Sequence, residues 1–495
     1  MSSRPALFAA LMLVAPASAA MAQDTPPEGG TVSPRLAGVL AEKGLEPIGV
    51  EIWTRPNAPA PRGAAEIEPE HYLASLQPGE IRDLAASGSI AYVAPADPIV
   101  APDPVDEPAS KGGWSLGSAS KAVTPRRSAD WPSGTGSGIT IGVIDFGEVP
   151  ATFHVAAQRK FGRPGTSAHG SAVLAILHRL APQARLVFAG LSPTAATTSD
   201  VQSAALWLEA QGARIITFSG ATYSNRRDGF APIDRIVDAQ AARGVLWVAA
   251  SGNEARRSWS GLSIDRDGDG LVDIGAGLNA VTLTSNGPVT LTLTWDDWGL
   301  RGPPGGQWNI DLLVSDSRGR LLAAERTRRG PIGEPVKVLT LPKLAPGTYH
   351  IALPLRGKGP AVRVRLTATG KATYLSPAVP FGSIGNPATA RGAIAVAAID
   401  PASATTTAYS GQGPTADRRA KPEFGASGAG SGGDWGTSYS APRIAALAAR
   451  IWSNSPRLGA IALRAALERY SQRVARRSVL GEAPRWIDTR LQGVP

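Results

Sequence analysis

Four polar residues that lie far apart in the chain are of the types that acyl transfer at a serine requires. Asp145 ends the apolar run ITIGVID, and His169 begins the helical pattern HGSAVLAIL. Asn253 follows the apolar run VLWVAASG, and Ser438 stands where the small-residue turn GTS enters a helical pattern. A neutral imidazole can take a serine proton, a carboxylate can fix the imidazole tautomer, and an amide can donate to a tetrahedral oxyanion. Together the four residues contain the groups that such chemistry needs.

Each of these residues also has an ordinary structural explanation. Serine is a favoured helix-capping residue, which would suffice for Ser438. Asp145 fits a turn, and Asn253 fits the end of a strand. His169 could be structural, as we expect of His178 in the same helix. The combination and its chain order, rather than any single residue, favour the chemical interpretation.

An alternation of strands and helices must position the four residues. Such an alternation predicts a parallel sheet with helices on both faces, the doubly wound α/β architecture. The carboxyl ends of parallel strands meet at one edge, where catalytic groups gather. Strand patterns occupy 138–147, 184–190, 214–220 and 245–253, and helical patterns occupy 169–180, 201–212 and 231–244.

Four short segments carry a family resemblance. GVIDFG, HGSAVLAI, VAASGN and GTSYSAP resemble the signature segments of the subtilisin-like serine proteases (subtilases), and they occur in that family's order. The resemblance implies that Asp145 orients the imidazole, His169 is the general acid/base, Ser438 is the nucleophile and Asn253 is the oxyanion donor. It covers roughly 125–258 and 373–470, and we expect a catalytic domain in two parts, 120–258 and 373–475.

The resemblance also implies a substrate cleft for proteins or peptides. TFSGAT at 217–222 is similar to the strand along which a peptide substrate pairs through its backbone. The residues that would flank the pocket before the scissile bond are small, which predicts a roomy apolar pocket. These substrate-binding residues are Ser219, Gly220, Ala221, Ala250 and Gly252.

Some positions depart from the family pattern. Phe146 and Ser171 stand where the family more often has threonine, and Tyr439 and Ser440 replace the usual methionine and alanine. None of these changes removes a catalytic atom, so they affect the expected shape of the cleft. The short interval between Asp145 and His169 also predicts that an intervening surface helix is trimmed.

Residues 259–372 alternate apolar and polar positions with the period of a strand, including two runs on either side of an NGP turn. We therefore expect an inserted all-β domain. LTWDDWG and NIDLLVSDSRG resemble strands of pre-peptidase C-terminal-type jelly rolls. The resemblance leaves two functions open for the insert, a stabilising spacer or a module that binds substrate or a surface.

The segment DRDGDGLVD at 265–273 has the spacing of a calcium loop. Alternating carboxylates around one bend supply the hard oxygen ligands that Ca²⁺ prefers. The twelfth position is Ala276, so the usual bidentate glutamate is missing, and an acidic solvated turn remains the alternative. We expect a structural Ca²⁺ and no organic cofactor. The predicted metal ligands are Asp265, Asp267, Asp269 and Asp273.

The ends of the chain predict export and processing. Residues 1–22 have the pattern of a secretory signal peptide, and no later run of about 20 apolar residues predicts a membrane span. Residues 23–110 read as a propeptide and linker, since 39–97 resembles the inhibitory propeptides of subtilases. We expect it to be an intramolecular inhibitor that is cut off between Ala96 and Ser120, whereas 476–495 is a polar tail.

Composition excludes other classes of function. The chain has no cysteine, so thiol chemistry and disulfides are absent. Its net charge of +10 comes from arginines scattered among acids, which argues against a nucleic-acid partner. The sequence thus predicts a secreted serine endopeptidase, in the periplasm or outside the cell. The alternatives are a non-catalytic binding or adhesion protein on a subtilase scaffold, and a lipase or esterase, whose G-x-S-x-G turn does not surround Ser438.

Overall fold

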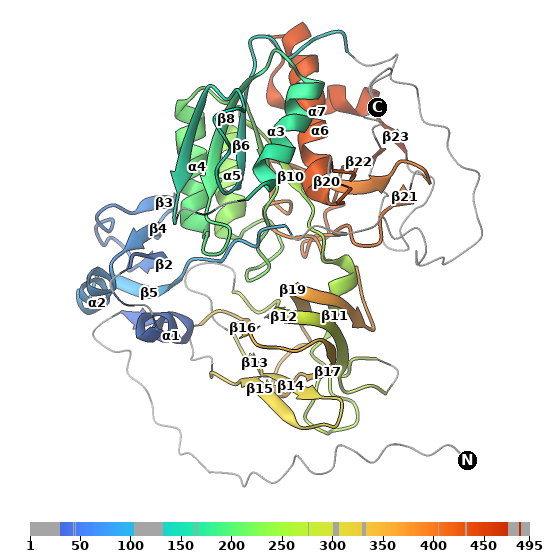
Figure 1. Ribbon diagram of the computed structural model, residues 1–495. Helices are drawn as coiled ribbons and strands as arrows, with labels where there is room; N and C mark the ends of the chain where they lie inside the picture. Colours follow the sequence, from blue (N-terminus) through green and yellow to red (C-terminus); the bar gives the residue numbers. More distant parts are fainter. Residues whose placement is uncertain are drawn as a thin grey trace.

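The computed structural model describes residues 30–473 and 485–486, except for 43, 45, 103–131, 164, 166, 276, 300–305, 329–332, 404 and 431–432. The predicted signal peptide at 1–22 lies outside the described residues, as does most of the predicted tail. Within the described part, no helix is long and apolar enough to cross a membrane. Figure 1 shows an α/β part, a β-rich part below it, and an N-terminal module beside both.

A ten-stranded, mostly parallel sheet forms the centre of the α/β part. Its order is β23-β24-β22-β20-β10-β9-β6-β8-β7, and the short β21 pairs with β20. The strands that follow one another from β7 to β24 in this order are all parallel. The bounds are β6 Thr140–Phe146, β7 Ala157–Phe161, β8 Arg185–Leu191, β9 Ile215–Phe218, β10 Leu246–Ala250, β20 Ala393–Asp400, β21 Thr405–Thr406, β22 Phe424–Ser427, β23 Gln472–Arg473 and β24 Arg485–Trp486.

Helices cover both faces of this sheet, as the alternating pattern predicts. One face packs against α3 (His169–Leu180) and α6 (Thr437–Asn454), with Val173 and Ile444 among its buried residues. The other face packs against α4 (Thr198–Ala210) and α5 (Pro232–Ala242). On each face, apolar side chains of the helices pack against apolar side chains of the strands, and this packing stabilises the parallel sheet. Helix α7 (Ala460–Arg469) packs on α6.

The N-terminal module combines a five-stranded sheet with two helices. The sheet has the order β1-β5-β2-β4-β3, and the core includes Leu36, Ile52 and Ile81. The bounds are β1 Thr31–Val32, α1 Pro34–Glu42, β2 Ile48–Thr54, β3 Ala65–Glu68, β4 His71–Leu76, α2 Pro78–Ala86 and β5 Ile90–Pro95.

Residues 258–376 form an antiparallel β module between β10 and β20. Its main sheet has the order β11-β19-β12-β17-β14-β15, with β16 also paired to β12, and β13 pairs with β18. The core contains Trp259, Trp295 and Leu366. The bounds are β11 Ser258–Leu262, β12 Val281–Trp295, β13 Trp308–Ile310, β14 Leu312–Asp316, β15 Leu321–Glu325, β16 Val336–Leu341, β17 Gly347–Ala352, β18 Leu355–Gly357 and β19 Arg363–Ser376.

Within this module, the expected turn at NGP is wrong. Strand β12 continues through it, and the register against β19 shifts between Ser285 and Val289, which marks a bulge. Gly287 adopts φ +150, and the Ser285 hydroxyl donates to the Gly287 carbonyl. Glycine and proline at a bulge bend a strand without ending it. One edge of β12 therefore pairs with β17 before the bulge and with β16 after it.

Candidate active site

Asp145 is the penultimate residue of β6, a central strand of the parallel sheet. Its side chain is fully buried. One carboxylate oxygen, Oδ1, accepts a hydrogen bond from the backbone N–H of Phe146 and lies 2.7 Å from His169 Nδ1. The second oxygen is buried without a hydrogen-bond partner in the described part of the chain. The geometry holds His169 with Nδ1 protonated and facing the acid.

His169 is the first residue of α3, and its side chain is 12% exposed. Because Nδ1 faces Asp145, the other nitrogen, Nε2, is the one left to exchange a proton. Nε2 is buried, and no hydrogen-bond partner for it occurs among the residues described. A neutral imidazole held this way presents a basic nitrogen to the space beside it.

Two carboxylates set the basicity of this imidazole. Burial disfavours the charged ring and lowers the pKa of His169, but the charge and hydrogen bond of Asp145 and the charge of Asp434 together outweigh burial. The net pKa of His169 is therefore raised above its ordinary value. Asp434 also accepts a hydrogen bond from the hydroxyl of Tyr439, whose ring stacks on His169 with a centroid distance of 5.3 Å.

Ser438 is the second residue of α6, in the first turn of a long buried helix. Its side chain is buried, and the backbone carbonyl accepts from the Ser219 hydroxyl at 3.4 Å. The stacked ring of Tyr439, the next residue, places this helix start beside His169. The N-terminal amide groups and dipole of α6 favour negative charge at this point.

Asn253 lies three residues beyond β10 and reaches the same helix start. Its Oδ1 accepts from the backbone N–H of Thr437 at 2.9 Å and from the Thr437 hydroxyl at 3.0 Å. These two bonds orient the amide so that its NH₂ group points away from Thr437. A Cβ built on Gly436 would lie 2.9 Å from Ser438 Oγ and 3.2 Å from Asn253 Nδ2, so both atoms border the space that this glycine leaves.

The predicted substrate-binding residues surround this helix start on two segments. Ser219 contacts Ser438, and the backbone N–H of Gly252 donates to the Thr437 hydroxyl at 3.2 Å. Gly220 and Ala221 continue the segment after β9, whereas the side chain of Ala250 belongs to the core under α6. The expected roomy pocket stays a prediction.

A segment of the chain itself lies along Gly220 and Ala221. Val100 and Ala221 exchange two backbone hydrogen bonds, 2.7 and 3.2 Å long, in an antiparallel bridge. The N–H of Ile99 donates to the carbonyl of Ala196 on the other side. A Cβ on Gly220 would come within 3.0 Å of Ile99 Cγ2, so the missing side chain leaves room for isoleucine.

Asp97 anchors this segment, and sequence reasoning missed it. The carboxylate is buried and accepts from the Ser224 hydroxyl at 2.9 Å and from the Asn225 amide at 2.7 Å. Its backbone carbonyl accepts from Thr198 at the start of α4. Burial raises the pKa of Asp97, although the two donors offset part of this effect. The partners lie more than 100 positions away, so no local pattern could indicate them.

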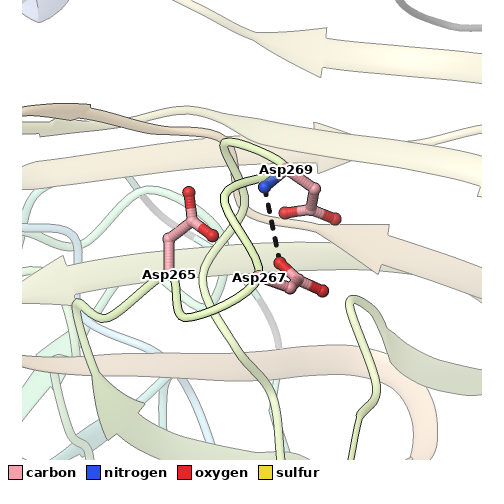
Figure 2. Close-up of side chains that lie close together, drawn as sticks. All are labelled: Asp265, Asp267 and Asp269. Carbon is pink, nitrogen blue, oxygen red and sulfur yellow. Dashed lines mark hydrogen bonds between the residues drawn. The ribbon is translucent and has the colours of Figure 1, made fainter.

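Three of the four predicted metal ligands lie together in one loop of the β module (Figure 2). Carboxylate oxygens of Asp265, Asp267 and Asp269 lie within 4.8 Å of one another. Burial and the charges of its two neighbours raise the pKa of Asp269. Asp273 instead pairs with Arg266 at 2.7 Å, and position twelve of the loop, Ala276, lies outside the described residues.

The comparison with protein families bears on the segment of the chain that contains Ser438. Residues 367–482 match the model of the subtilase family. The match includes Ser438, while Asp145, His169 and Asn253 precede it. No curated protein sequence matches the chain.

Solved structures of proteases are similar to this chain. The CspB protease of Clostridium perfringens has a TM-score of 0.54 at 14% sequence identity, and the match covers 72% of this chain and 94% of that one. The epidermin leader peptide processing serine protease of Staphylococcus aureus has a TM-score of 0.44 at 11% identity, over 90% of this chain and 97% of the other. At this identity the likeness to the CspB protease shows a shared fold.

Proposed function

We propose that the protein is a serine endopeptidase that hydrolyses peptide bonds through an acyl-enzyme on Ser438. The observation that carries this proposal is the hydrogen bond between Asp145 and His169 beside the helix start that bears Ser438. The subtilase match over 367–482 and the protease fold support the same conclusion. The non-catalytic alternative is disfavoured because the acid, the imidazole and the helix start that bears Ser438 lie together.

In the proposed reaction, Nε2 of His169 takes the proton of Ser438 as Oγ attacks the substrate carbonyl. Asp145 stabilises the imidazolium that forms, and the NH₂ of Asn253 donates to the oxyanion together with the start of α6. His169 then returns the proton to the leaving amine, and water hydrolyses the ester by the same proton transfers. The water-poor setting strengthens each of these electrostatic contacts.

Hydrolysis of an unfolded protein substrate tests this function. Purified wild-type protein, once its N-terminal segment has been cleaved off, should release peptides from reduced and alkylated casein, and Ser438→Ala should not. Ser440→Ala is the matched control, because this hydroxyl donates to the carbonyl of Ala426 in the core and faces no substrate. Equal hydrolysis by wild type and Ser438→Ala would overturn the proposal.

We also infer that residues 30–102 form an intramolecular inhibitor. This inference is supported by the backbone pairing of Val100 with Ala221 and by the anchoring of Asp97. The N-terminal module also contacts the α/β part through α5, where Glu68 forms an ion pair with Arg235 at 2.6 Å. A segment paired in this way occupies the place that a substrate backbone would take.

Proline at position 100 tests the inhibitor. Val100→Pro removes the N–H that donates to Ala221, so uncleaved protein should react faster with an active-site serine probe. Val100→Ala keeps the donor and should react like the wild type. No increase for Val100→Pro in correctly folded, uncleaved protein would contradict the inference.

We also propose a Ca²⁺ site in the β module and export of the protein. Asp265, Asp267 and Asp269 would hold a structural Ca²⁺, because three carboxylates share one bend and supply hard oxygen ligands. Export would follow from the signal pattern at 1–22, which lies outside the described residues. N-terminal sequencing of the protein in the culture medium and periplasm of its host would test it.

A further inference from the structure

Glu254, the residue after Asn253, is buried where an isolated carboxylate would be costly. Its Oε2 accepts from the backbone N–H of Asn253 at 2.7 Å and from the hydroxyl of Tyr223. Its Oε1 accepts from the guanidinium of Arg257 at 3.1 Å. A buried carboxylate is stable when it is paired and hydrogen-bonded, so these donors hold Glu254 in one place. The position of the Asn253 backbone is thereby tied to Glu254.

Arg257 connects this carboxylate to the β module. Its Nη1 donates to the carbonyl oxygens of Gly370 at 3.2 Å and of Ala372 at 3.4 Å, both in β19. Strand β19 pairs along most of β12 and along β11, so it is a rigid element of the module. The guanidinium therefore bridges the loop after β10 and strand β19 of the inserted sheet.

Tyr223 provides a second connection. Arg227 lies over its ring, with the guanidinium carbon 5.1 Å from the centroid. Arg227 is buried and donates to the carbonyl of Gly382 at 2.8 Å and to the hydroxyl of Thr367, again in β19, at 3.1 Å. Arg257, which donates to Glu254, and Arg227, which lies over the ring of Tyr223, thus both donate hydrogen bonds to β19.

Gly252 shows how tightly these groups are packed. It adopts φ +99, and a Cβ there would lie 2.2 Å from the Tyr223 hydroxyl and 2.9 Å from Glu254 Oε2. Neither the conformation nor the space admits another residue. The loop that carries Asn253 is consequently shaped by the Tyr223–Glu254 pair.

We propose that Glu254 is a positioning residue through which the inserted β module sets the conformation of the loop that bears Asn253. The kinetic part of this inference rests on the proposed function. The module then stabilises the transition state at a distance, because it fixes an oxyanion donor, and it is more than a spacer. Loss of the connection between Arg257 and Glu254 should lower kcat much more than it changes KM, because an oxyanion donor acts in the transition state.

A double-mutant cycle tests whether Glu254 acts through Asn253. Glu254→Gln keeps the shape of the side chain and removes its charge, and we expect kcat to fall about tenfold, with KM within about twofold. In an Asn253→Ala background, the same substitution should have no further effect on kcat. Equal effects of Glu254→Gln in both backgrounds would overturn the proposal.

Substitutions at Arg257 test the connection from the side of the module. Arg257→Met should lower kcat as Glu254→Gln does, and Arg257→Lys, which keeps a donor, should recover part of the loss. Arg320→Met is the matched control, because Arg320 forms an exposed ion pair with Asp316 in a distant turn of the same module. Arg257→Lys also provides a testable variant if Arg257→Met fails to fold.

Hydrogen exchange tests the coupling without any enzymatic activity. In Arg257→Lys, amides of 252–254 should exchange faster than in the wild type, while those of β10 should be unchanged. Unchanged exchange at 252–254 would overturn the coupling, whatever the kinetics show. Faster exchange in a protein without peptidase activity would uphold it and reject the proposed function instead.

Discussion

The candidate active site and the acidic loop of the β module differ in how their polar groups are held. In the active site, Asp145 and His169 come from separate elements, and each fixes the orientation of the other. Asp145 is fully buried and His169 is nearly so. In the loop, Asp265, Asp267 and Asp269 come from one short segment that is largely exposed. Their carboxylates accept hydrogen bonds mainly from backbone N–H groups of the loop itself.

This difference determines what each region can do. Buried groups that are fixed by the fold act with little reorganisation, so small changes there should have large effects on rate. Carboxylates on an exposed loop are screened by water, so changes there should have small effects on stability.

The largest effect after loss of the nucleophile is expected at Asp145. Asp145→Asn keeps the size of the side chain, but its amide cannot hold His169 in the required tautomer. We expect kcat to fall about 10⁴-fold at neutral pH, with little change in KM. Steady-state kinetics would measure this, and Asp316→Asn, on an exposed turn, is the matched control. A loss smaller than tenfold would contradict the role of Asp145.

Asn253 should have an intermediate effect. Asn253→Ala removes the proposed oxyanion donor, and kcat should fall by about 10²–10³ with KM nearly unchanged. The substitution also frees the N–H and hydroxyl of Thr437, so the melting temperature must be measured beside the kinetics. A rise in KM at unchanged kcat would show that Asn253 binds the ground state instead.

Asp434 should change the pH profile. Activity rises with pH as His169 loses its proton, and the negative charge of Asp434 contributes to the raised pKa of that imidazole. Asp434→Asn should therefore lower this pKa and move the acid limb of kcat/KM to lower pH. The pH dependence of kcat/KM for both proteins would measure the shift. An acid limb that stays in place, or moves to higher pH, would contradict the contribution of Asp434.

The smallest effect on activity is expected in the acidic loop. Ca²⁺ at about one hundred times its Kd should stabilise the module by about 2.7 kcal/mol, seen as a rise in its melting temperature. Asp267→Asn should abolish the rise. It is the mildest choice, because within the described part of the chain Asp267 accepts one hydrogen bond, a long one of 3.4 Å from the backbone N–H of Asp269. The same rise in Asp267→Asn and wild type would argue against this site, and calorimetric titration would show whether Ca²⁺ binds at all.

The parallel sheet could be predicted from the sequence, because buried strands and amphipathic helices have distinct periods. The residues at the carboxyl ends of those strands followed from the same pattern and from the family resemblance. The continuity of β12 could not be predicted, because an NGP segment is equally compatible with a turn and with a bulge that pairing partners stabilise.

The contacts around the candidate active site could not be predicted from the sequence either. Ile99 against Gly220, and Arg257 against β19, depend on partners more than 100 positions away. Asp434 is the exception, since it lies four residues before Ser438 and could have been noticed as a nearby charge. Its proximity to His169, however, depends on the close approach of Tyr439, which no local pattern indicates.

Covalent labelling would show whether His169 activates Ser438. A fluorophosphonate reacts with a serine that a neighbouring base activates, and mass spectrometry can locate the adduct. We expect one adduct on Ser438 of the processed wild-type protein and none in a folded His169→Ala variant. No adduct, an adduct on another residue, or equal labelling without His169 would contradict the activation of Ser438 by His169.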